Sequence, residues 1–276
     1  MSALKTGTRG QGLVLRVLPA GMYAGRARML VERSMLVNRK MWLVIASGFF
    51  EPLFYLLAFQ VGFGRLVETV PGPGGQLMSY VAFVAPGLLA SSAMNGAVYD
   101  STFNIFFKFR YQKLYDAMLA TPLGPFDVAI GEISWALLRG GLYAAAFFGV
   151  MLGMGLVFSV WAVLLVPAAL LVAFAFAAVG MAATTWIRST TDFGLIQLAV
   201  IPMFLFSTTF FPLSVFPPAL QVMVQCFPLY HGVELMRGLS TGVVDSGMLG
   251  HVGYLAALAV IGLLVATRRL GTLLLR

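Results

Sequence analysis

The sequence predicts an all-α integral membrane protein with six membrane-spanning helices. Three observations lead to this fold class: the composition, the lengths of the apolar runs and the placement of the basic residues. Of the 276 residues, 60% are hydrophobic and only 10% are charged, with a mean hydropathy of +0.91. A soluble globular protein has roughly 45–50% apolar and about 25% charged residues. One soluble core cannot bury so large an excess of apolar residues, so we expect a single membrane domain at residues 41–276.

The apolar runs are close to the roughly 20 residues that a membrane helix needs. We predict spans at residues 41–62, 79–107, 128–152, 160–187, 193–211 and 249–266. The stretch between the last two spans is broken into short apolar pieces by Pro212, Pro217, Pro218 and Pro228. Irregular backbone at membrane depth must be shielded by protein or line a wet cavity. We therefore expect a re-entrant helical segment there, extending to about Arg237.

The basic residues indicate the orientation in the membrane. Most Lys and Arg residues fall in the segments 1–40, 108–113 and 268–276, which six spans would place on one side. The positive-inside rule then puts both termini and the 108–113 segment in the cytoplasm of a cell-membrane protein. The net charge of +8 is interpreted as this topology signal and as contact with anionic membrane lipids, not as nucleic-acid binding.

The first 40 residues are predicted to form a basic cytoplasmic tail. From Tyr23 to Val37, apolar residues alternate with the basic residues Arg26, Arg28 and Arg33. This pattern favours an amphipathic helix that lies on the membrane surface, with a helix that contacts only a protein partner as the alternative. The pattern of a cleaved signal peptide is missing, because no apolar core precedes a small-residue cleavage site.

Thiol and imidazole groups are too few for a metal centre. A single cysteine, Cys226, excludes an intrachain disulfide and a zinc cluster. The two histidines, His231 and His251, lie far apart in the sequence without metal-ligand spacing. We expect no metal and no cofactor in this chain.

A polar, Pro-containing break at residues 108–132 separates the second and third predicted spans. The pattern predicts a short helix from Phe106 to Leu119 that ends before Pro122. Apolar and aromatic residues recur on one face of this helix at Tyr111, Leu114, Tyr115 and Met118. Polar residues occupy another face at Lys108, Gln112 and Asp116. Such a helix suits either a groove on a partner protein or the lipid headgroups.

The motifs of several enzyme classes are missing from the sequence. There is no G-x-x-x-x-G-K-[ST] phosphate-binding loop, so ATP-driven transport would need a separate ATPase chain. There is also no G-x-S-x-G or H-E-x-x-H motif. An intramembrane hydrolase built from Glu51, His231 and Glu234 remains an alternative.

Several motifs in order resemble the ABC-2 type export permeases of the NodJ/DrrB-like group. They are EP with FYLLAF at 51–59, SYVAFVAPGLLASSAM at 79–94, DAMLATPL at 116–123 with GE at 131–132, IPMFLFSTTFFPLSVFP at 201–217 and PLYHGVELMRG at 228–238. The resemblance covers nearly the whole chain except the first 25 or so residues. The chain departs from the family's usual pattern at Leu114 and Gln60.

The resemblance implies a permease subunit that forms a homodimer, or a heterodimer with a second permease, and recruits nucleotide-binding ATPase subunits that carry ATP and Mg²⁺. The loop after the second span would hold a coupling helix that contacts the ATPase, and the N-terminal helix would lie against the same subunit. Carried over by position, Tyr111 to Met118 form the coupling surface. The full predicted coupling region comprises Lys108, Arg110, Tyr111, Gln112, Leu114, Tyr115, Asp116, Met118 and Glu132.

Charged residues inside apolar spans are expensive, and they mark functional sites by default. We expect Glu132, near the cytoplasmic end of its span, to stabilise the coupling region. Arg139 could pair with Glu51 across spans. His231, Glu234 and Arg237 are interpreted as a structural network that closes the exterior side, with a proton relay or a substrate-headgroup site as the alternative.

The predicted function is ATP-driven export by the membrane subunit of a transporter. An apolar path lined by Phe54, Met94, Phe204 and Phe206 would favour an amphipathic or lipid-like cargo, such as a hydrophobic drug or a lipid-linked glycan. Two other classes remain: a secondary transporter, which should show internal repeats and mid-span coupling charges, and a membrane anchor subunit without ATPase coupling.

Overall fold

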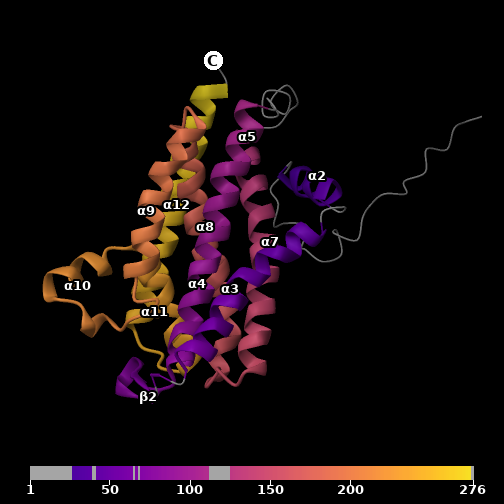
Figure 1. Cartoon of the computed structure of the whole chain (residues 1–276). Coiled ribbons are helices and arrows are strands. Elements are labelled where there is room, and N and C mark those ends of the chain that lie inside the picture. Colours follow the sequence, from indigo (N-terminus) through magenta and orange to yellow (C-terminus); the bar gives the residue numbers. More distant parts are fainter. Residues whose placement is uncertain (1–26, 39–41, 65, 68, 112–124, 275–276) are drawn as a thin grey trace, which may run out of the picture.

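A computed structural model of the chain describes residues 27–38, 42–64, 66–67, 69–111 and 125–274. It shows a bundle of long helices, with short helices and a small two-stranded ribbon at its margins (Figure 1). The long elements are α3 (Trp42–Gly62), α4 (Tyr80–Tyr99), α7 (Pro125–Gly153), α8 (Leu165–Thr184), α9 (Phe193–Phe206) and α12 (Gly247–Leu274). The shorter ones are α2 (Ala27–Asn38), α5 (Ile105–Arg110), α10 (Pro218–Gln225), α11 (Pro228–Thr241), β1 (Val70–Pro71) and β2 (Leu77–Met78).

Four helical segments of the described chain are long and apolar enough to cross a membrane. They are Tyr80–Arg110, Phe126–Gly153, Val160–Thr184 and Gly247–Leu273. The first and fifth predicted spans correspond to shorter apolar helices, Pro52–Gly62 and Thr190–Phe206. The 14 residues of α9 rise only about 21 Å, less than the roughly 30 Å of a bilayer core. The prediction of a helical membrane protein is confirmed, while the count of six spans stays a prediction.

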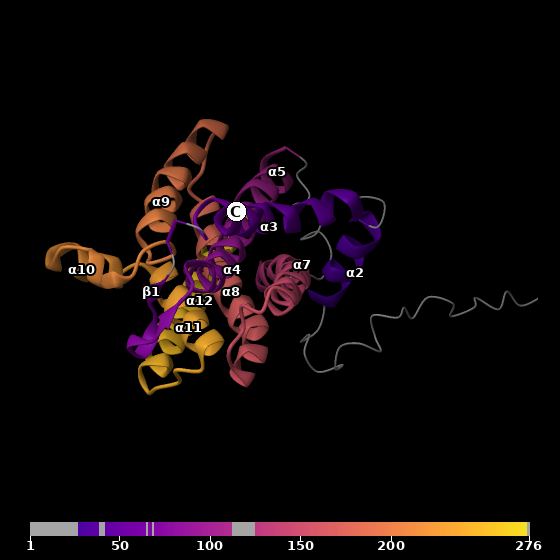
Figure 2. The same ribbon diagram turned by 60° about the horizontal axis from the view of Figure 1, so that its bottom comes forward.

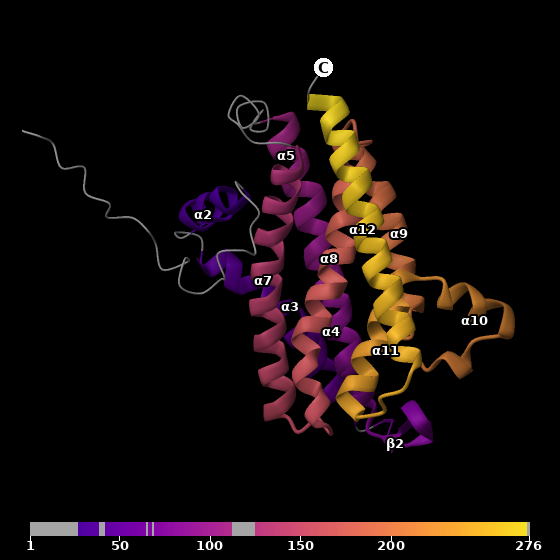
Figure 3. The same cartoon turned by 180° about the vertical axis from the view of Figure 1, so that it is seen from behind.

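The helix α8 lies at the centre of the bundle, between α7 and α12 in the view from behind (Figure 3). Its buried face carries small residues, among them Ala169, Ala173, Ala177 and Ala178. Small residues let helix backbones approach closely in lipid. The two helices approach closely at Gly262 of α12, where an added Cβ would lie 2.8 Å from the Ala178 carbonyl carbon. The packing of α8 against α12 therefore requires glycine at 262.

The second predicted span is one continuous helical segment with a local change of pitch. Ser79 caps the start of α4, because its hydroxyl accepts a hydrogen bond from the Ala82 amide at 3.3 Å. A π-helical turn, η3 (Asp100–Asn104), joins α4 to α5. A π-turn holds one residue more than an α-turn and is often found at functional sites. Asp100 is the first residue of this turn, and its side chain belongs to the site described below.

The chain between α9 and α12 is irregular, as the prolines predict. After α9 ends at Phe206, the residues Ser207, Thr208 and Thr209 are fully or almost fully buried, and Thr208 has a φ of +57°. Two short helices follow: α10 projects sideways from the bundle, whereas α11 packs against α4 and α12 (Figures 1 and 2). Their 8 and 14 residues are too few to cross a bilayer. Their depth in the membrane stays a prediction.

The predicted amphipathic helix near the N-terminus is present as α2, and it packs against α7. Leu30 and Val31 are buried, whereas Arg33 is exposed. Arg26 and the side chain of Arg28 lie outside the described residues. Thus α2 buries its apolar side on protein, a contact that our expectation of a helix on the membrane surface did not include.

Candidate functional site: a membrane cavity and two ion pairs

A cavity of about 690 Å³ lies among α3, α4, α7 and α9. Its volume is in the range of small-molecule sites. The lining residues that carry polar groups are Tyr55, Ser91, Ser92, Asn95, Tyr99, Thr102, Arg139, Tyr143 and Gln197. The apolar lining includes Pro52, Leu88, Val98, Val200, Ile201 and Phe204. A cavity with both kinds of wall can hold a molecule that has a polar head and an apolar body.

Of the four apolar residues expected to line the path, the structure brings only Phe204 to this cavity. Met94 is fully buried in the core of the bundle. Phe54 and Phe206 are exposed on the outer surface of α3 and α9. The sequence pattern showed that these residues are apolar, but the face on which each lies depends on how the helices pack.

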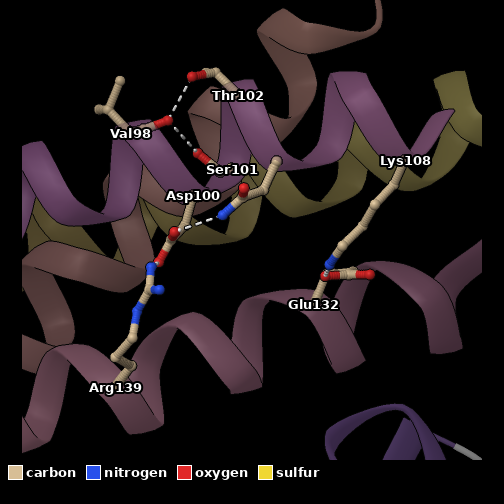
Figure 4. Close-up of polar contacts among 8 residues, drawn as sticks. Val98, Asp100, Ser101, Thr102, Lys108, Glu132 and Arg139 are labelled. Carbon is tan, nitrogen blue, oxygen red and sulfur yellow. Dashed lines mark hydrogen bonds and ion pairs between the residues drawn. The ribbon is translucent and has the colours of Figure 1, made fainter. Parts of the chain in front are cut away.

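Arg139, which lines the cavity, belongs to an ion pair that joins two helices. Arg139 of α7 donates from Nη2 to the Asp100 carboxylate, and the Asn104 amide donates to the other carboxylate oxygen at 2.8 Å (Figure 4). Asp100 is buried, and the Arg139 side chain is 22% exposed. Burial of a charge in lipid-like surroundings is tolerated only with such a partner.

Within the described residues Arg139 pairs with Asp100. The expected contact between Arg139 and Glu51 stays a prediction, because the side chain of Glu51 lies outside the described residues. Asp100 was not among the predicted site residues. The signal that could have found it was present, because Asn95 and Asp100 are polar residues inside an apolar run.

A second ion pair joins the same two helical segments nearer their loop ends. Lys108 of α5 donates to Glu132 of α7 at 2.6 Å, as Figure 4 shows, and Glu132 is buried. Lys108 follows Asp100 by eight residues, and Glu132 precedes Arg139 by seven, which is about 12 and 10.5 Å along the two helices. Lys108 and Glu132 flank the segment 112–124, so this pair ties together the two helices that enter and leave it.

The coupling surface itself is described only in part. Lys108 and Arg110 lie in the last turn of α5, and Tyr111 is exposed immediately after it. Phe107 and Tyr111 stack with ring centroids 5.3 Å apart. The remaining predicted coupling residues, Gln112, Leu114, Tyr115, Asp116 and Met118, lie outside the described residues.

A buried polar network surrounds Arg237 of α11, outside the cavity lining. Its guanidinium donates to Glu234 at 2.7 Å, to the Thr208 carbonyl at 2.6 Å and to the Phe83 carbonyl at 3.3 Å. It also stacks over the Phe83 ring at 3.8 Å. Burial lowers the pKa of the Arg237 guanidinium, and the charge of Glu234 opposes that effect. Arg237 was expected to form a structural network with His231 and Glu234; the structure pairs it with Glu234 and leaves only 2% of it exposed.

The two histidines meet in space although they lie far apart in the sequence. His231 of α11 and His251 of α12 have their Nδ1 atoms 2.7 Å apart, and the His231 ring stacks on Tyr254 at 4.0 Å. Burial and the neighbouring His251 lower the pKa of His231. Within the described part of the chain, no group of three or more His, Cys, Asp or Glu could hold a metal ion. Sequence spacing could not reveal the pair, because it depends on the packing of α11 on α12.

Comparison with known proteins places this architecture in a family. The family model described as ABC-2 type transporter matches residues 26–240. Nodulation protein J of Rhizobium leguminosarum bv. viciae is 32% identical over 235 residues, which is 84% of this chain and 88% of that protein. Nodulation protein J of Rhizobium meliloti is 30% identical over 81% of this chain and 84% of its own length. That of Bradyrhizobium diazoefficiens is 29% identical over 89% of this chain and 92% of its own length.

The matches extend from α2 to the end of α11 and include the cavity, both ion pairs and the Arg237 network. Members of this family are the membrane components of transporters and are not themselves catalytic. They generally pair with ATPase subunits. The protein described here, embedded in the membrane by several helices, therefore belongs to the ABC-2 type transporter family as a permease component.

Proposed function

We propose that this chain is the permease subunit of an ATP-driven exporter, and that it moves an amphipathic or lipid-like molecule out of the cytoplasm or the inner leaflet. The cavity among α3, α4, α7 and α9 carries this proposal, because its lining combines hydroxyl, amide and guanidinium groups with apolar side chains. A drug with a polar group and a lipid-linked glycan both fit this description.

The energy would come from ATP and Mg²⁺ bound by separate nucleotide-binding subunits, because the chain has no phosphate-binding loop. The segment 112–124 would contact the ATPase together with Lys108, Arg110 and Tyr111. Glu132 supports this role, since its ion pair with Lys108 holds the ends of α5 and α7 together. A displacement of the segment by the ATPase would then move both helices as a unit.

The permease would act as a pair, either with a second copy or with a related chain. The helices α3 and α9, which line the cavity, expose apolar side chains such as Leu57, Val61, Leu195 and Leu198. A second permease placed on these faces would complete the wall of the path. Both termini would lie in the cytoplasm, an orientation that the positive-inside rule favours. In Figure 1 the α5 end and the end of α12, with its Arg268 and Arg269, lie at the same end of the bundle.

The test is purification of the full-length chain from its native membrane, followed by identification of the chains that accompany it. We expect a soluble ATPase with a phosphate-binding loop to co-purify in a ratio of one to one. We also expect vesicles that contain the complex to accumulate a fluorescent amphiphile only with ATP and Mg²⁺. Co-purification without any ATPase, or accumulation driven by an ion gradient alone, would contradict the proposal.

A further inference from the structure

The Asp100–Arg139 pair is asymmetric with respect to the cavity. Arg139 lines the 690 Å³ cavity, whereas Asp100 does not; Asp100 lines a much smaller pocket of about 30 Å³ behind it, together with Arg139, Gly140 and Ala173. The cation therefore faces the space that a cargo could occupy, and the anion stands behind the cation. Figure 4 shows the two side chains extending toward each other from neighbouring helices.

The hydrogen bonds of the pair are also unequal. Both carboxylate oxygens of Asp100 are engaged, one by Asn104 and one by Arg139. The guanidinium has five N–H donors, and the structure gives Arg139 one hydrogen bond within the described chain. Asp100 thus fixes one edge of the guanidinium and leaves further donors near the polar wall made by Asn95, Tyr99 and Tyr143.

The Lys108–Glu132 pair lacks this arrangement. It joins the same helical segments about two turns away, and neither residue lines the cavity. The two pairs therefore share a structural role, holding α7 against the segment Tyr80–Arg110, but only the Asp100–Arg139 pair presents a charge to the cavity. This contrast provides a matched control.

We propose that the Arg139 guanidinium binds the polar head of the cargo through hydrogen bonds. Asp100 is a positioning residue that holds this guanidinium toward the cavity. The ligand class is an amphiphile whose head offers hydrogen-bond acceptors, such as sugar hydroxyls, a carboxylate or a phosphate. A head with a positive charge and no acceptor is disfavoured. The inference rests on the proposed function, and it adds which residues recognise the cargo and which head groups they prefer.

The expected effect follows from the strength of charge-assisted hydrogen bonds. Hydrogen bonds to ionised groups are about twice as strong as neutral ones, and most so where water is excluded. Loss of one such bond to a bound cargo should weaken binding on the order of tenfold to a hundredfold. The pairing with Asp100 keeps the site close to neutral, so an uncharged sugar head and an anionic head should both bind.

The experiment measures binding of three probes with the same tail to the full-length protein in phosphatidylcholine vesicles, without ATP. The probes are dodecyl glucoside, dodecyl phosphate and dodecyltrimethylammonium, and inorganic phosphate serves as the control without a tail. We expect wild type to bind the first two and to discriminate against the third. Equal binding of dodecyltrimethylammonium, or no binding of either acceptor probe, overturns the inference. Added phosphatidylglycerol that displaces dodecyl phosphate but leaves dodecyl glucoside bound would assign the phosphate signal to a lipid.

The decisive variants exchange the charges of each pair. In Asp100→Arg with Arg139→Asp the ion pair is restored, but the cation now stands behind the anion. We expect thermal stability to return to near that of wild type, while affinity for dodecyl glucoside stays at least about tenfold weaker. In the control, Lys108→Glu with Glu132→Lys, we expect both stability and probe affinity to be retained. Wild-type affinity in the first exchange would show that the pair is only structural and would overturn the inference.

A second variant keeps the proposal testable if the exchanged protein fails to fold. Asp100→Asn preserves size and an acceptor for Arg139, but it removes the compensating negative charge. We expect the affinity for dodecyl phosphate to rise relative to that for dodecyl glucoside, whereas an unchanged ratio overturns the inference. Because binding is measured without ATP, probe binding in a protein that has no ATPase partner would refute the proposed function alone.

Discussion

Arg237 of α11 donates a hydrogen bond of 2.6 Å to the carbonyl oxygen of Thr208, a residue with positive φ just after the end of α9. A β-branched residue is rarely found in this conformation. The same guanidinium binds Glu234, which in turn accepts from the Thr208 hydroxyl at 2.8 Å. One buried side chain thus stabilises both the irregular backbone that follows α9 and the Glu234 carboxylate.

Replacement of Arg237 should be strongly destabilising. Arg237→Met removes the cation and leaves the Glu234 carboxylate and the Thr208 carbonyl without their donor. Breaking a buried ion pair from one side costs about 3–5 kcal/mol. We expect a large fall in the thermal midpoint of the detergent-solubilised protein. The double variant Arg237→Met with Glu234→Gln should recover part of the loss, and equal loss in both variants would contradict the role of the ion pair.

The close approach of α12 to α8 should tolerate no side chain at Gly262. Gly262→Val places atoms where even a Cβ would lie 2.8 Å from the Ala178 backbone, so the helices must separate. Overpacking typically costs about 1–3 kcal/mol. The matched control is Gly253→Ala on the same helix, where an added Cβ meets nothing within 4 Å. There the better helix propensity should leave the thermal midpoint equal or slightly higher.

Filling the cavity should stop transport without unfolding the protein. Val200→Trp on α9 adds a large ring to the cavity lining, and we expect export of a fluorescent amphiphile from cells to fall to near background. Val260→Trp on α12 is the control, because Val260 is 55% exposed and α12 does not line the cavity. Both variants should express at wild-type levels by immunoblot. Full export by Val200→Trp would exclude this cavity as the path.

The histidine pair should make stability depend on pH. Burial and His251 lower the pKa of His231 below its usual value of about 6.5. In the window between the lowered folded-state value and about 6.5, the unfolded chain binds more protons, so stability rises with pH. Stability is therefore complete above about 6.5 and is lost as the pH falls through the folded-state value.

This pH effect can be measured from thermal midpoints between about pH 5 and 8. The variant His231→Gln removes the titrating ring, so its midpoint should change less over this range than that of wild type. The groups around His231 are His251, Tyr230, Tyr254, Glu234 and the Gln225 backbone. An equal pH dependence in the variant would assign the effect to other groups. Export that changes with pH in wild type but not in the variant would indicate the proton relay instead.

The membrane fold was largely accessible from the sequence, because local signals set it. Ser79 before a long apolar run predicted the start of α4, and the prolines after Phe211 predicted the short helices α10 and α11. The 14-residue length of α9 was not predicted, since the apolar run continues beyond its last turn. There the buried hydroxyls of Ser207 to Thr209 and the contacts of Arg237 end the helix.

Only part of the candidate site could be predicted from the sequence. Glu132 and Arg139 were identified because charges are rare and costly inside apolar helices, and Lys108 was identified as part of the polar break between two spans. Their partners depend on the register between α7 and the segment Tyr80–Arg110, which a single sequence does not contain. For the same reason Asp100 was missed as the partner of Arg139, and the two histidines were read as unrelated.

The π-helical turn at Asp100–Asn104 gives the helical segment one residue more than a regular α-helix would use there. Deletion of one residue within this turn, for instance Phe103, would convert it to an ordinary α-turn. Everything after it would then rotate by about 100° and shift by about 1.5 Å relative to α4. Lys108 would swing away from Glu132, while Asp100 would keep its place beside Arg139. The one additional residue of this turn thus sets the rotational position of Lys108 and the loop that follows relative to the cavity.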